Sequence, residues 1–293
     1  MRFFDRLHPA VSFLYFVLIL FITMFTLHPV LLGILFLTGI LFYAELKGLR
    51  ALLKSLAYTL PLMLVITLMN PLFVHRGNTV LFFLNGSPVT KEALIYGFFT
   101  SLMLFAIFYF CQAYSVLMTS DKFIYLFGRV IPKLSLVFSM TLAALPRLLR
   151  KYREIDEAQK GLGIYATNSW IDKVKSKLRV FSILVSWSLE ASVETADSMR
   201  ARGYGLKGRT AYSDYRFTSS DTVFLLLTLL LGGTVAVLLF MGVSDFSYYP
   251  TVDALRLSPL SLLLYGTLAL LASLSILSEG KETLLWHYWE SKI

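Results

Sequence analysis

A glycine-rich stretch at residues 203–208 is the part of this sequence whose residue types and spacing most directly suggest chemistry. It reads Gly-Tyr-Gly-Leu-Lys-Gly and matches the phosphate-binding pattern G-x-G-x-x-G; up to Thr210 it also matches a P-loop, except that Arg209 replaces the lysine. Both patterns bind nucleotides only where a buried strand precedes the glycines and a helix follows them. Here an amphipathic helical pattern precedes the glycines, and no acidic residue follows at the interval of a dinucleotide site. We therefore reject nucleotide binding by this chain itself.

The histidines, the cysteine and the polar residues of the apolar segments form no constellation typical of a metal centre or an active site. Cys111 is the single cysteine, so neither an internal disulfide nor a thiolate cluster can form. The apolar segments hold Asn70 and Gln112 but no central Asp, Glu, Lys or His, which argues against a proton-coupled transporter or an intramembrane enzyme. No two histidines stand at the spacing of metal ligands: His8, His28, His75 and His287. We expect no catalytic residue, no metal site and no cofactor.

The composition places the chain in a membrane. It has 293 residues, of which 57% are hydrophobic and 15% charged, whereas soluble domains are about 45–50% apolar and about 25% charged. A membrane-spanning helix needs roughly 17–25 apolar residues. Six segments qualify or nearly so: 10–27, 30–44, 56–74, 93–118, 222–241 and 259–277. The sequence predicts an all-α polytopic membrane protein, a helical bundle of about six spans.

Two details of these segments give further expectations. The third contains Pro61 and Pro71, so we expect a kinked helix there. Between the third and fourth segments, the apolar run Val80–Leu84 is followed by Asn85 and Gly86, which predicts a turn or a short hairpin.

The distribution of positive charge predicts the orientation. With the N-terminus inside, all but three of the 27 Lys and Arg side chains lie in cytoplasmic segments, the exceptions being Arg76, Lys91 and Arg256. Both termini are therefore expected to be cytoplasmic. The chain divides into three regions: an N-terminal membrane region of about four spans, a cytoplasmic or interfacial region, and a C-terminal membrane region of about two spans with a short tail. Their bounds are 1–118, 119–216 and 217–293.

The middle region contains two long amphipathic helical patterns, and Pro132 and Pro146 interrupt the segment before the first of them. The apolar run 134–145 between these prolines is too short to cross the membrane and is expected to be partly immersed. Apolar residues recur at spacings of three and four in both patterns: Leu145, Leu148, Leu149, Tyr152 and Ile155 in the first, and Val174, Leu178, Phe181, Val185, Leu189 and Ala196 in the second. Such basic helices either rest on lipid with their cations near head groups or dock a cytosolic partner, and periodicity alone leaves both possibilities open.

Both amphipathic patterns end at glycines. The first ends at Gly161 and Gly163 and the second at Gly203, because glycine accepts the left-handed conformation that terminates helices. Arg200 and Arg202 fall in the last turn of the second helix, where cations complement the helix dipole. Judged from this pattern alone, Arg200 and Arg202 need have no role beyond stabilising the end of the helix.

These endings resemble those of the transmembrane T component of energy-coupling factor (ECF) transporters, a branch of ABC-type importers for vitamins and metal ions. The early Leu7-His8-Pro9 and the segment Asn70-Pro71-Leu72-Phe73 add to the resemblance. The family's second motif is matched by Ala201-Arg202-Gly203, with Arg200 before it and Tyr204 after it. The first motif, Pro…Glu…Ala-Gln-x-Ala-Arg-Gly, is matched less well, by Pro146, Glu154 or Glu157, and Ala158-Gln159-Lys160-Gly161-Leu162-Gly163.

The resemblance implies a non-catalytic transporter subunit in the plasma membrane of a prokaryote. Its amphipathic helices would be coupling helices, each docking its terminal motif in one of two ABC-type ATPase subunits, where the arginine would pair with acidic residues. ATP-driven motion would pass to a membrane-embedded S component that binds the vitamin or metal ion. Lipid is the remaining partner, and no nucleic acid is expected.

One residue departs from the family pattern. Leu162 stands where the first motif has arginine, so that end cannot form the same charge pair. The two ATPases are then expected to differ, with the first dock held by apolar contact or by Lys160. The alternative function is a membrane scaffold or regulator that recruits cytosolic partners through the same basic helices.

Overall fold

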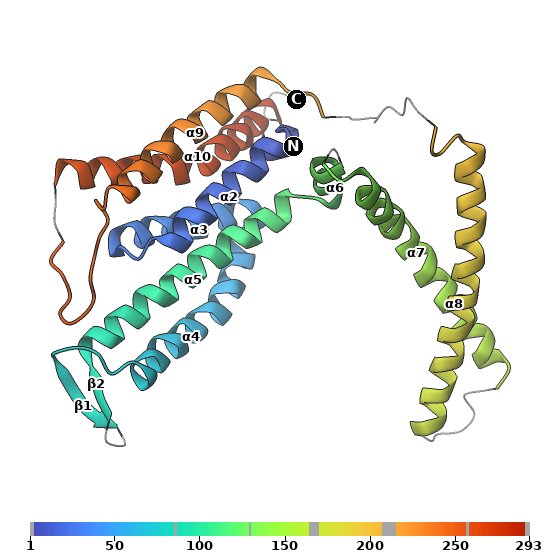
Figure 1. Cartoon of the computed structure of the whole chain (residues 1–293), viewed down its shortest axis with the longest axis horizontal. Helices are drawn as coiled ribbons and strands as arrows, with labels where there is room; N and C mark the ends of the chain where they lie inside the picture. Colours follow the sequence, from blue (N-terminus) through green and yellow to red (C-terminus); the bar gives the residue numbers. More distant parts are fainter. Residues whose placement is uncertain are drawn as a thin grey trace. The chain divides into compact units, whose positions relative to one another are not determined.

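The computed structural model describes residues 3–84, 87–128, 130–163, 170–206, 215–255 and 258–290, without the side chains of residues 84, 87 and 282–290. Within these ranges the chain forms ten helices and one two-stranded sheet (Figure 1). In chain order these are α1 (Phe3–Arg6), α2 (Pro9–Phe25), α3 (Pro29–Lys47), α4 (Leu49–Phe73), β1 (Val80–Leu84), β2 (Ser87–Thr90), α5 (Lys91–Leu117), α6 (Ser120–Gly128), α7 (Pro132–Gly161), α8 (Trp170–Ala201), α9 (Ser219–Phe240) and α10 (Pro259–Glu290).

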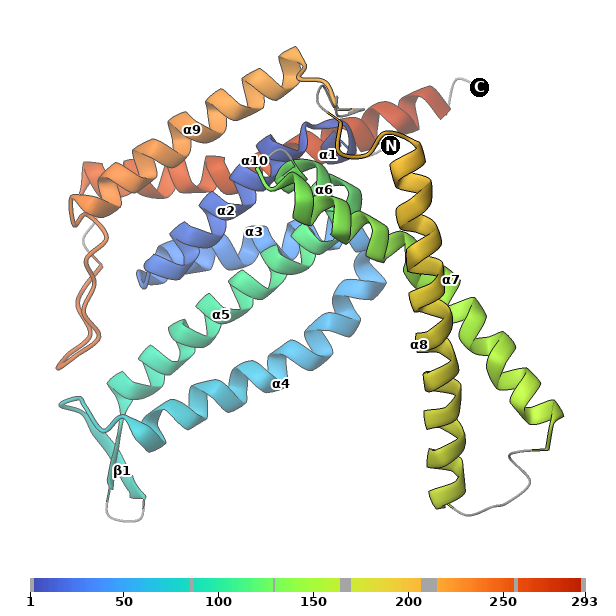
Figure 2. The same cartoon turned by 45° about the vertical axis from the view of Figure 1, so that its right-hand side comes forward.

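Two compact units divide the chain. One combines Met1–Phe123 with Tyr215–Ile293, and we call it the membrane unit. The other, Ile124–Asp214, contains α7 and α8 and is called the crossed-helix unit, because these two helices cross in both views (Figures 1 and 2).

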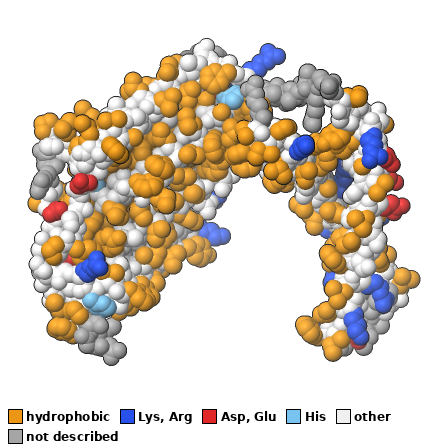
Figure 3. Space-filling view, in the orientation of Figure 1, with side chains coloured by type: hydrophobic (Ala, Val, Ile, Leu, Met, Phe, Trp, Pro, Cys, Tyr) orange, Lys and Arg blue, Asp and Glu red, His pale blue; other side chains and the backbone are white. Residues whose placement is uncertain are grey.

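The membrane unit contains the expected apolar helices. Five are long and apolar enough to cross a membrane: α3, α4, α5, α9 and residues 259–281 of α10. The first predicted segment forms α2, a shorter apolar helix of 17 residues. The segment that looked short in the sequence is the 19-residue α3. The prediction of an all-α polytopic membrane protein is confirmed. In the space-filling view hydrophobic side chains cover most of the visible face of this unit (Figure 3).

Local sequence explains where several of these helices begin. Proline is the first residue of α2 and of α3, where its missing N–H is not needed. The Thr90 hydroxyl caps α5 by accepting from the N–H of Ala93. Thr218 and Asp221 form a capping box at the start of α9. Helix α4 contains both Pro61 and Pro71.

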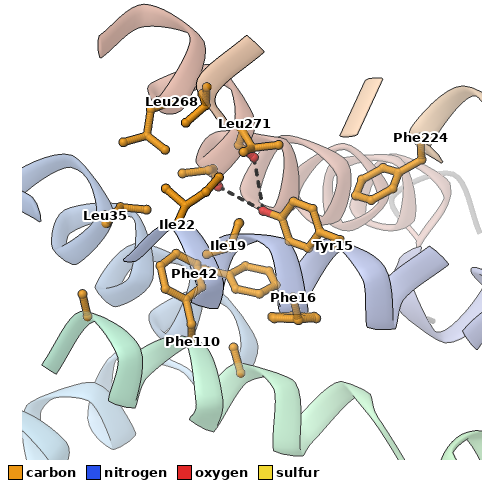
Figure 4. Close-up of a cluster of buried hydrophobic side chains, with 14 of the residues drawn as sticks. Tyr15, Phe16, Ile19, Ile22, Leu35, Phe42, Phe110, Phe224, Leu268 and Leu271 are labelled. Carbon is orange, nitrogen blue, oxygen red and sulfur yellow. Dashed lines mark hydrogen bonds between the residues drawn. The ribbon is translucent and has the colours of Figure 1, made fainter. Parts of the chain in front are cut away.

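An aromatic cluster lies at the centre of the membrane unit. Phe4 is fully buried, and its ring centroid lies 5.7–6.1 Å from those of Tyr15, Phe16, Phe42 and Phe224. The Tyr15 hydroxyl is also buried and lies within hydrogen-bonding distance of the carbonyls of residues 271 and 272 in α10, at 3.3 and 3.4 Å (Figure 4). The cluster joins α1, α2, α3 and α9 through shape and dispersion, which is how helices associate in lipid.

The predicted hairpin is also present. Strands β1 and β2 pair antiparallel, with Phe82 opposite Val89 and Phe83 opposite Pro88. The hairpin ends at Thr90, the residue that caps α5, so the connection between α4 and α5 has regular structure. The hairpin prediction is confirmed.

The position of Pro146 corrects one expectation. We expected the first amphipathic helix to start after Pro146, but α7 is a single 30-residue helix that begins at Pro132 and contains Pro146. An interior proline costs about 3 kcal/mol of helix stability. The residues on either side, Ala143, Ala144 and Leu145 before it and Arg147, Leu148 and Leu149 after it, are all strong helix formers. The helix therefore continues through the proline and includes the run 134–145.

Candidate functional site

The end of α8 has a backbone geometry that glycine permits and other residues resist. Arg202 is the residue after the last helical position, and Gly203 has φ of +82°. The N–H of Gly203 donates to the carbonyl of Arg200 at 2.9 Å, and the N–H of Tyr204 donates to the carbonyl of Met199 at 3.0 Å. These two bonds are the Schellman arrangement, in which the left-handed residue lets the chain turn back onto the helix.

Helix α7 ends in the same way. Gly161 is its last residue, Leu162 follows, and Gly163 has φ of +72°. The N–H of Leu162 donates to the carbonyl of Ala158 at 3.1 Å, and the N–H of Gly163 donates to the carbonyl of Lys160 at 3.0 Å. The next residue, whose N–H would complete the Schellman motif, lies outside the described residues.

The two ends are therefore equivalent in backbone and different in chemistry. Leu162 and Arg202 each stand one residue before a left-handed glycine. Both side chains are exposed, Leu162 at 72%. One end presents an apolar side chain and the other a guanidinium at the same structural position.

The cations around the α8 end are available to a partner. Among the described residues no ion pair or hydrogen bond involves the Arg202 side chain. Arg200 lies 3.8 Å from Asp197, but both side chains are more than two thirds exposed, so the pair contributes little stability. Tyr204 is half exposed beside them. This end presents cations and an aromatic ring on a rigid turn.

The cation at the α7 end is paired within the unit instead. Lys160 lies 2.8 Å from Asp156, one helical turn before it. Gln159 lies beside Lys160 with its side-chain oxygen buried and without a hydrogen-bond donor among the described residues. Ala158 is exposed. Leu162, at 72%, is more exposed than the Lys160 side chain, at 58%.

Asp156 also holds the two helices together, which the sequence analysis did not anticipate. Lys177 of α8 donates to the Asp156 carboxylate at 3.0 Å and to the Tyr152 hydroxyl at 2.8 Å. These hydrogen bonds raise the pKa of Lys177, and the bond to Tyr152 has the larger effect. Asp156 is buried, so this carboxylate pairs with one lysine from each helix. The only sequence signal for it was an acid within a basic, amphipathic segment.

The predicted apolar stripes mostly face away from the crossing. Ile155, Ser176 and Val180 are the buried residues there together with Asp156. The other large apolar side chains with exposures above one third include Leu145, Leu149, Val174, Leu178, Phe181, Val185 and Leu189. The α7–α8 contact therefore uses a few apolar residues, Ile155 and Val180, beside the pairs of Asp156, and it leaves most of the apolar faces available to lipid or to another protein.

The crossing separates the two motifs. The helices run antiparallel through it, because Asp156 contacts Lys177 while Lys151 lies over the ring of Trp187. From the crossing α7 continues for six residues to Leu162, about 9 Å, and α8 continues for 25 residues to Arg202, about 38 Å in the opposite sense. Figures 1 and 2 show the motif-bearing ends at opposite ends of the pair. They are two separate exposed helix ends.

Buried charges in the membrane unit were also missed from the sequence. Lys122 of α6 is 4% exposed and donates to the carbonyls of Phe4 at 2.8 Å and Leu117 at 3.2 Å. Burial lowers the pKa of Lys122, and the nearby carboxylates of Asp5 and Glu279 oppose that effect. The Glu279 carboxylate accepts from the N–H groups of residues 3 and 4. Only tertiary contacts reveal that these groups fasten α1 between α6 and α10.

The described part of the chain contains no group of three or more His, Cys, Asp or Glu side chains placed to hold a metal ion. What the crossed-helix unit offers instead is two exposed, rigidly capped helix ends. Residues 2–212 match the family of cobalt transport proteins called CbiQ. This range includes the ends of α7 and α8. The chain belongs to the CbiQ family.

Relatives of this CbiQ member carry the name energy-coupling factor transporter transmembrane protein EcfT. The protein of Listeria innocua is 28% identical over 186 residues, which are 58% of this chain and 69% of the relative. That of Bacillus selenitireducens is 28% identical over 213 residues, 69% and 76% of the two chains. That of Staphylococcus aureus is 26% identical over 192 residues, 61% and 72%. The resemblance to T components of ECF transporters is confirmed.

The other CbiQ-like segments named from the sequence hold the membrane unit together. In Leu7-His8-Pro9, the N–H of His8 donates to the carboxylate of Asp221 at 2.7 Å, which ties the starts of α2 and α9 together. Asn70 of the Asn-Pro segment donates to the carbonyl of Ala93 at 2.7 Å. Gly97 lies opposite, where a Cβ would come within 2.8 Å of Asn70. These segments position helices and leave the exposed ends of α7 and α8 as the candidate site.

Proposed function

We propose that this CbiQ member is the coupling subunit of an ECF-type ABC importer and that the ends of α7 and α8 dock two cytosolic ATPase subunits. One observation carries the proposal: the two helices end in equivalent capped turns, each with an exposed side chain directly before a left-handed glycine, at opposite ends of a crossed pair. Two separate and equivalent contact points fit two partner subunits better than one.

The α8 end would grip its ATPase by charge. An arginine can form two parallel hydrogen bonds with a carboxylate, and such charge-assisted bonds are short and strong. Arg202 has no competing partner among the described residues, and the Schellman turn fixes its backbone. We expect an acidic groove on this ATPase, with Arg200 and Tyr204 at its rim.

The α7 end would bind a different ATPase surface. Leu162 is exposed and apolar, and Lys160 is drawn to Asp156. A groove that accepts Leu162 must be apolar, so the two ATPases are proposed to be different subunits. Hydrolysis of ATP would occur in those subunits and not in this chain.

The crossing would carry motion between the two docks. Asp156 and Lys177 join α7 to α8 through a buried carboxylate, so the helices pivot about a fixed point when the ATPases close or separate. The exposed apolar faces of both helices would then move against a substrate-binding S component or against lipid. The cargo is set by the S component and belongs to the vitamin and metal-ion class.

Contacts in the membrane unit support both termini being on the cytoplasmic side. Residues 3 and 4 donate to Glu279 near the end of α10, so the first and last helices meet at one end of the bundle. At the other end the N–H of Asn78 donates to the carbonyl of Pro250, which joins the hairpin loop to the α9–α10 loop. The positive-inside rule assigns the first of these ends to the cytoplasm.

The test is to purify the chain in mild detergent after co-expression with its genomic neighbours, and to identify what co-elutes. We expect two ATPase subunits and a small hydrophobic protein, with one ATPase lost in the Arg202→Glu variant. Reversing the charge of a buried ion pair costs about 3 kcal/mol, or on the order of 100-fold in affinity.

Arg179→Glu is the matched control, since Arg179 is also exposed on α8 but lies away from its end. It should keep both ATPases. If the chain elutes alone, or with partners that are indifferent to Arg202, the coupling role is wrong and the membrane-scaffold alternative takes its place.

A further inference from the structure

The hairpin between α4 and α5 has an apolar surface that the coupling role does not use. In β1, Leu81 is 53%, Phe82 52% and Phe83 70% exposed. Successive strand residues point to opposite faces, so both faces of this strand present large apolar side chains. In water, an exposed apolar edge strand is a site for aggregation. This surface therefore needs a cover.

The base of the hairpin is rigidly attached to the bundle. Val89 and Thr90 of β2 are buried, and the Thr90 hydroxyl donates to the carbonyl of Arg76 at 2.9 Å. The Thr79 hydroxyl donates to the carboxylate of Glu92 at 2.6 Å. These bonds hold both strands to the start of α5, so β1 projects from a fixed base.

The lengths of the flanking helices set the depth of the hairpin. Helix α4 has 25 residues and α5 has 27, so at a rise of 1.5 Å per residue they are about 37 and about 40 Å long. The hydrocarbon core is only about 30 Å thick, and the ends of both helices reach the head-group layer. An unpaired strand edge is not tolerated in hydrocarbon, where no water can satisfy its N–H and carbonyl groups. The hairpin belongs at the boundary between head groups and acyl chains.

The charges around the base match that depth. Arg76 and Lys91 flank the hairpin, and His75 precedes it; all three are exposed. No ion pair joins any of them to another described residue. Cations beside aromatic and aliphatic side chains are the pattern of an interfacial anchor, with the cations at lipid phosphates.

We propose that the β1–β2 hairpin is a lipid anchor that lies in the head-group boundary of the leaflet farthest from α1, with acyl chains against both faces of β1 and phosphates near Arg76 and Lys91. A protein partner would shield one face, and strand addition by a second copy would cover the edge but leave the faces exposed. The proposal rests on the assignment of α4 and α5 as membrane spans and does not depend on ATPase docking.

The test uses the full chain alone in vesicles of phosphatidylethanolamine and phosphatidylglycerol. Cys111, the single cysteine, is first replaced by serine, and cysteines are then introduced one at a time for a nitroxide label. Phe82→Cys reports one face of β1 and Phe83→Cys the other, because these two residues pair in regular register with Val89 and Pro88. Leu81→Cys, at the register shift between Val80 and Phe82, reports the base of the strand. Leu64→Cys, exposed in the middle of α4, is the hydrocarbon reference, and Glu194→Cys of α8 is the water reference.

The measurement compares collision of each label with oxygen, which enters lipid, and with a water-soluble nickel chelate. Labels on both faces of β1 should lie between the two references, with nickel accessibility at least 3-fold below that of the water reference. Replacing Arg76 and Lys91 by glutamine should raise that accessibility.

Three outcomes would overturn the proposal: nickel accessibility equal to the water reference on both faces, shielding of one face only, or shielding that appears only when the other transporter subunits are added. The third label, Leu81→Cys on the same strand, guards against one misfolded variant. Because no ATPase is present, failure here is distinguishable from failure of the coupling role.

Discussion

The ends of α7 and α8 have nearly the same backbone and opposite chemistry. In both, a left-handed glycine ends the helix and fixes the residue before it on an exposed turn, which is Leu162 in one and Arg202 in the other. Their surroundings differ as well: Lys160 is paired with the buried Asp156, whereas Arg202 has no partner among the described residues. Glycine thus determines where the exposed residue stands, and the identity of that residue determines the chemistry that the helix end presents.

The largest expected effect comes from making the α8 end a copy of the α7 end. Arg202→Leu removes the guanidinium but keeps the turn, because the left-handed position is the next residue. We expect one ATPase to dissociate at least 30-fold more readily, since its acidic groove then lacks a partner. Titration of the purified ATPase against the chain in nanodiscs measures this. Arg200→Leu, two residues earlier, is the control and should change affinity by less than about 5-fold.

Removing the link at the crossing should have the next largest effect. Asp156→Ala deprives Lys177 and Lys160 of their common carboxylate, and we expect a loss of about 1–3 kcal/mol in the stability of the crossed-helix unit. Hydrogen exchange of α7 and α8 measures this loss. Asp197→Ala removes the exposed partner of Arg200 instead and should cost less than about 1 kcal/mol. Equal effects of the two substitutions would contradict the role given to Asp156.

The turns themselves can be strained without touching the contact residues. Gly203→Ala and Gly163→Ala place a Cβ at positive φ, which costs roughly 1–2 kcal/mol. Gly161→Ala is the matched control, because it lies inside the helix with open space around its Cα. It should be neutral or stabilising by about 0.5–1 kcal/mol. Limited proteolysis at the helix ends would detect the difference, and increased cleavage in the control would argue against the capped turns.

The smallest effect is expected from making the α7 end a copy of the α8 end. Leu162→Arg adds a guanidinium at an exposed position, so the chain should fold and assemble as before. If the first ATPase has an apolar groove, its affinity falls by about 10-fold or less, since a long side chain can keep its stem in the groove and its charge in water. Pull-down at several salt concentrations measures it. A gain in affinity would show that this groove is acidic, which would contradict two different docking surfaces.

Much of the architecture could be predicted because membrane insertion imposes strong local constraints. Six apolar segments, the hairpin after Val80 and the glycines that end two amphipathic helices are all recognisable from residue type and spacing alone. The continuation of α7 through Pro146 was not, because helix formers on both sides outweighed a local breaker. Thr218 and Asp221 form a capping box in the structure, and nothing local indicates that Asp221 also accepts the N–H of His8.

By itself the sequence determined the membrane class, the positions of the spans and the residues that stand before the two terminal glycines, since these depend on hydrophobicity, helix period and the freedom of glycine. Only the tertiary structure decided that Asp156 joins α7 to α8, that Lys122 and Glu279 fasten α1, and that both faces of β1 stay uncovered. Those features pair residues that are up to 276 positions apart. Such contacts follow from how helices pack, and no local pattern encodes them.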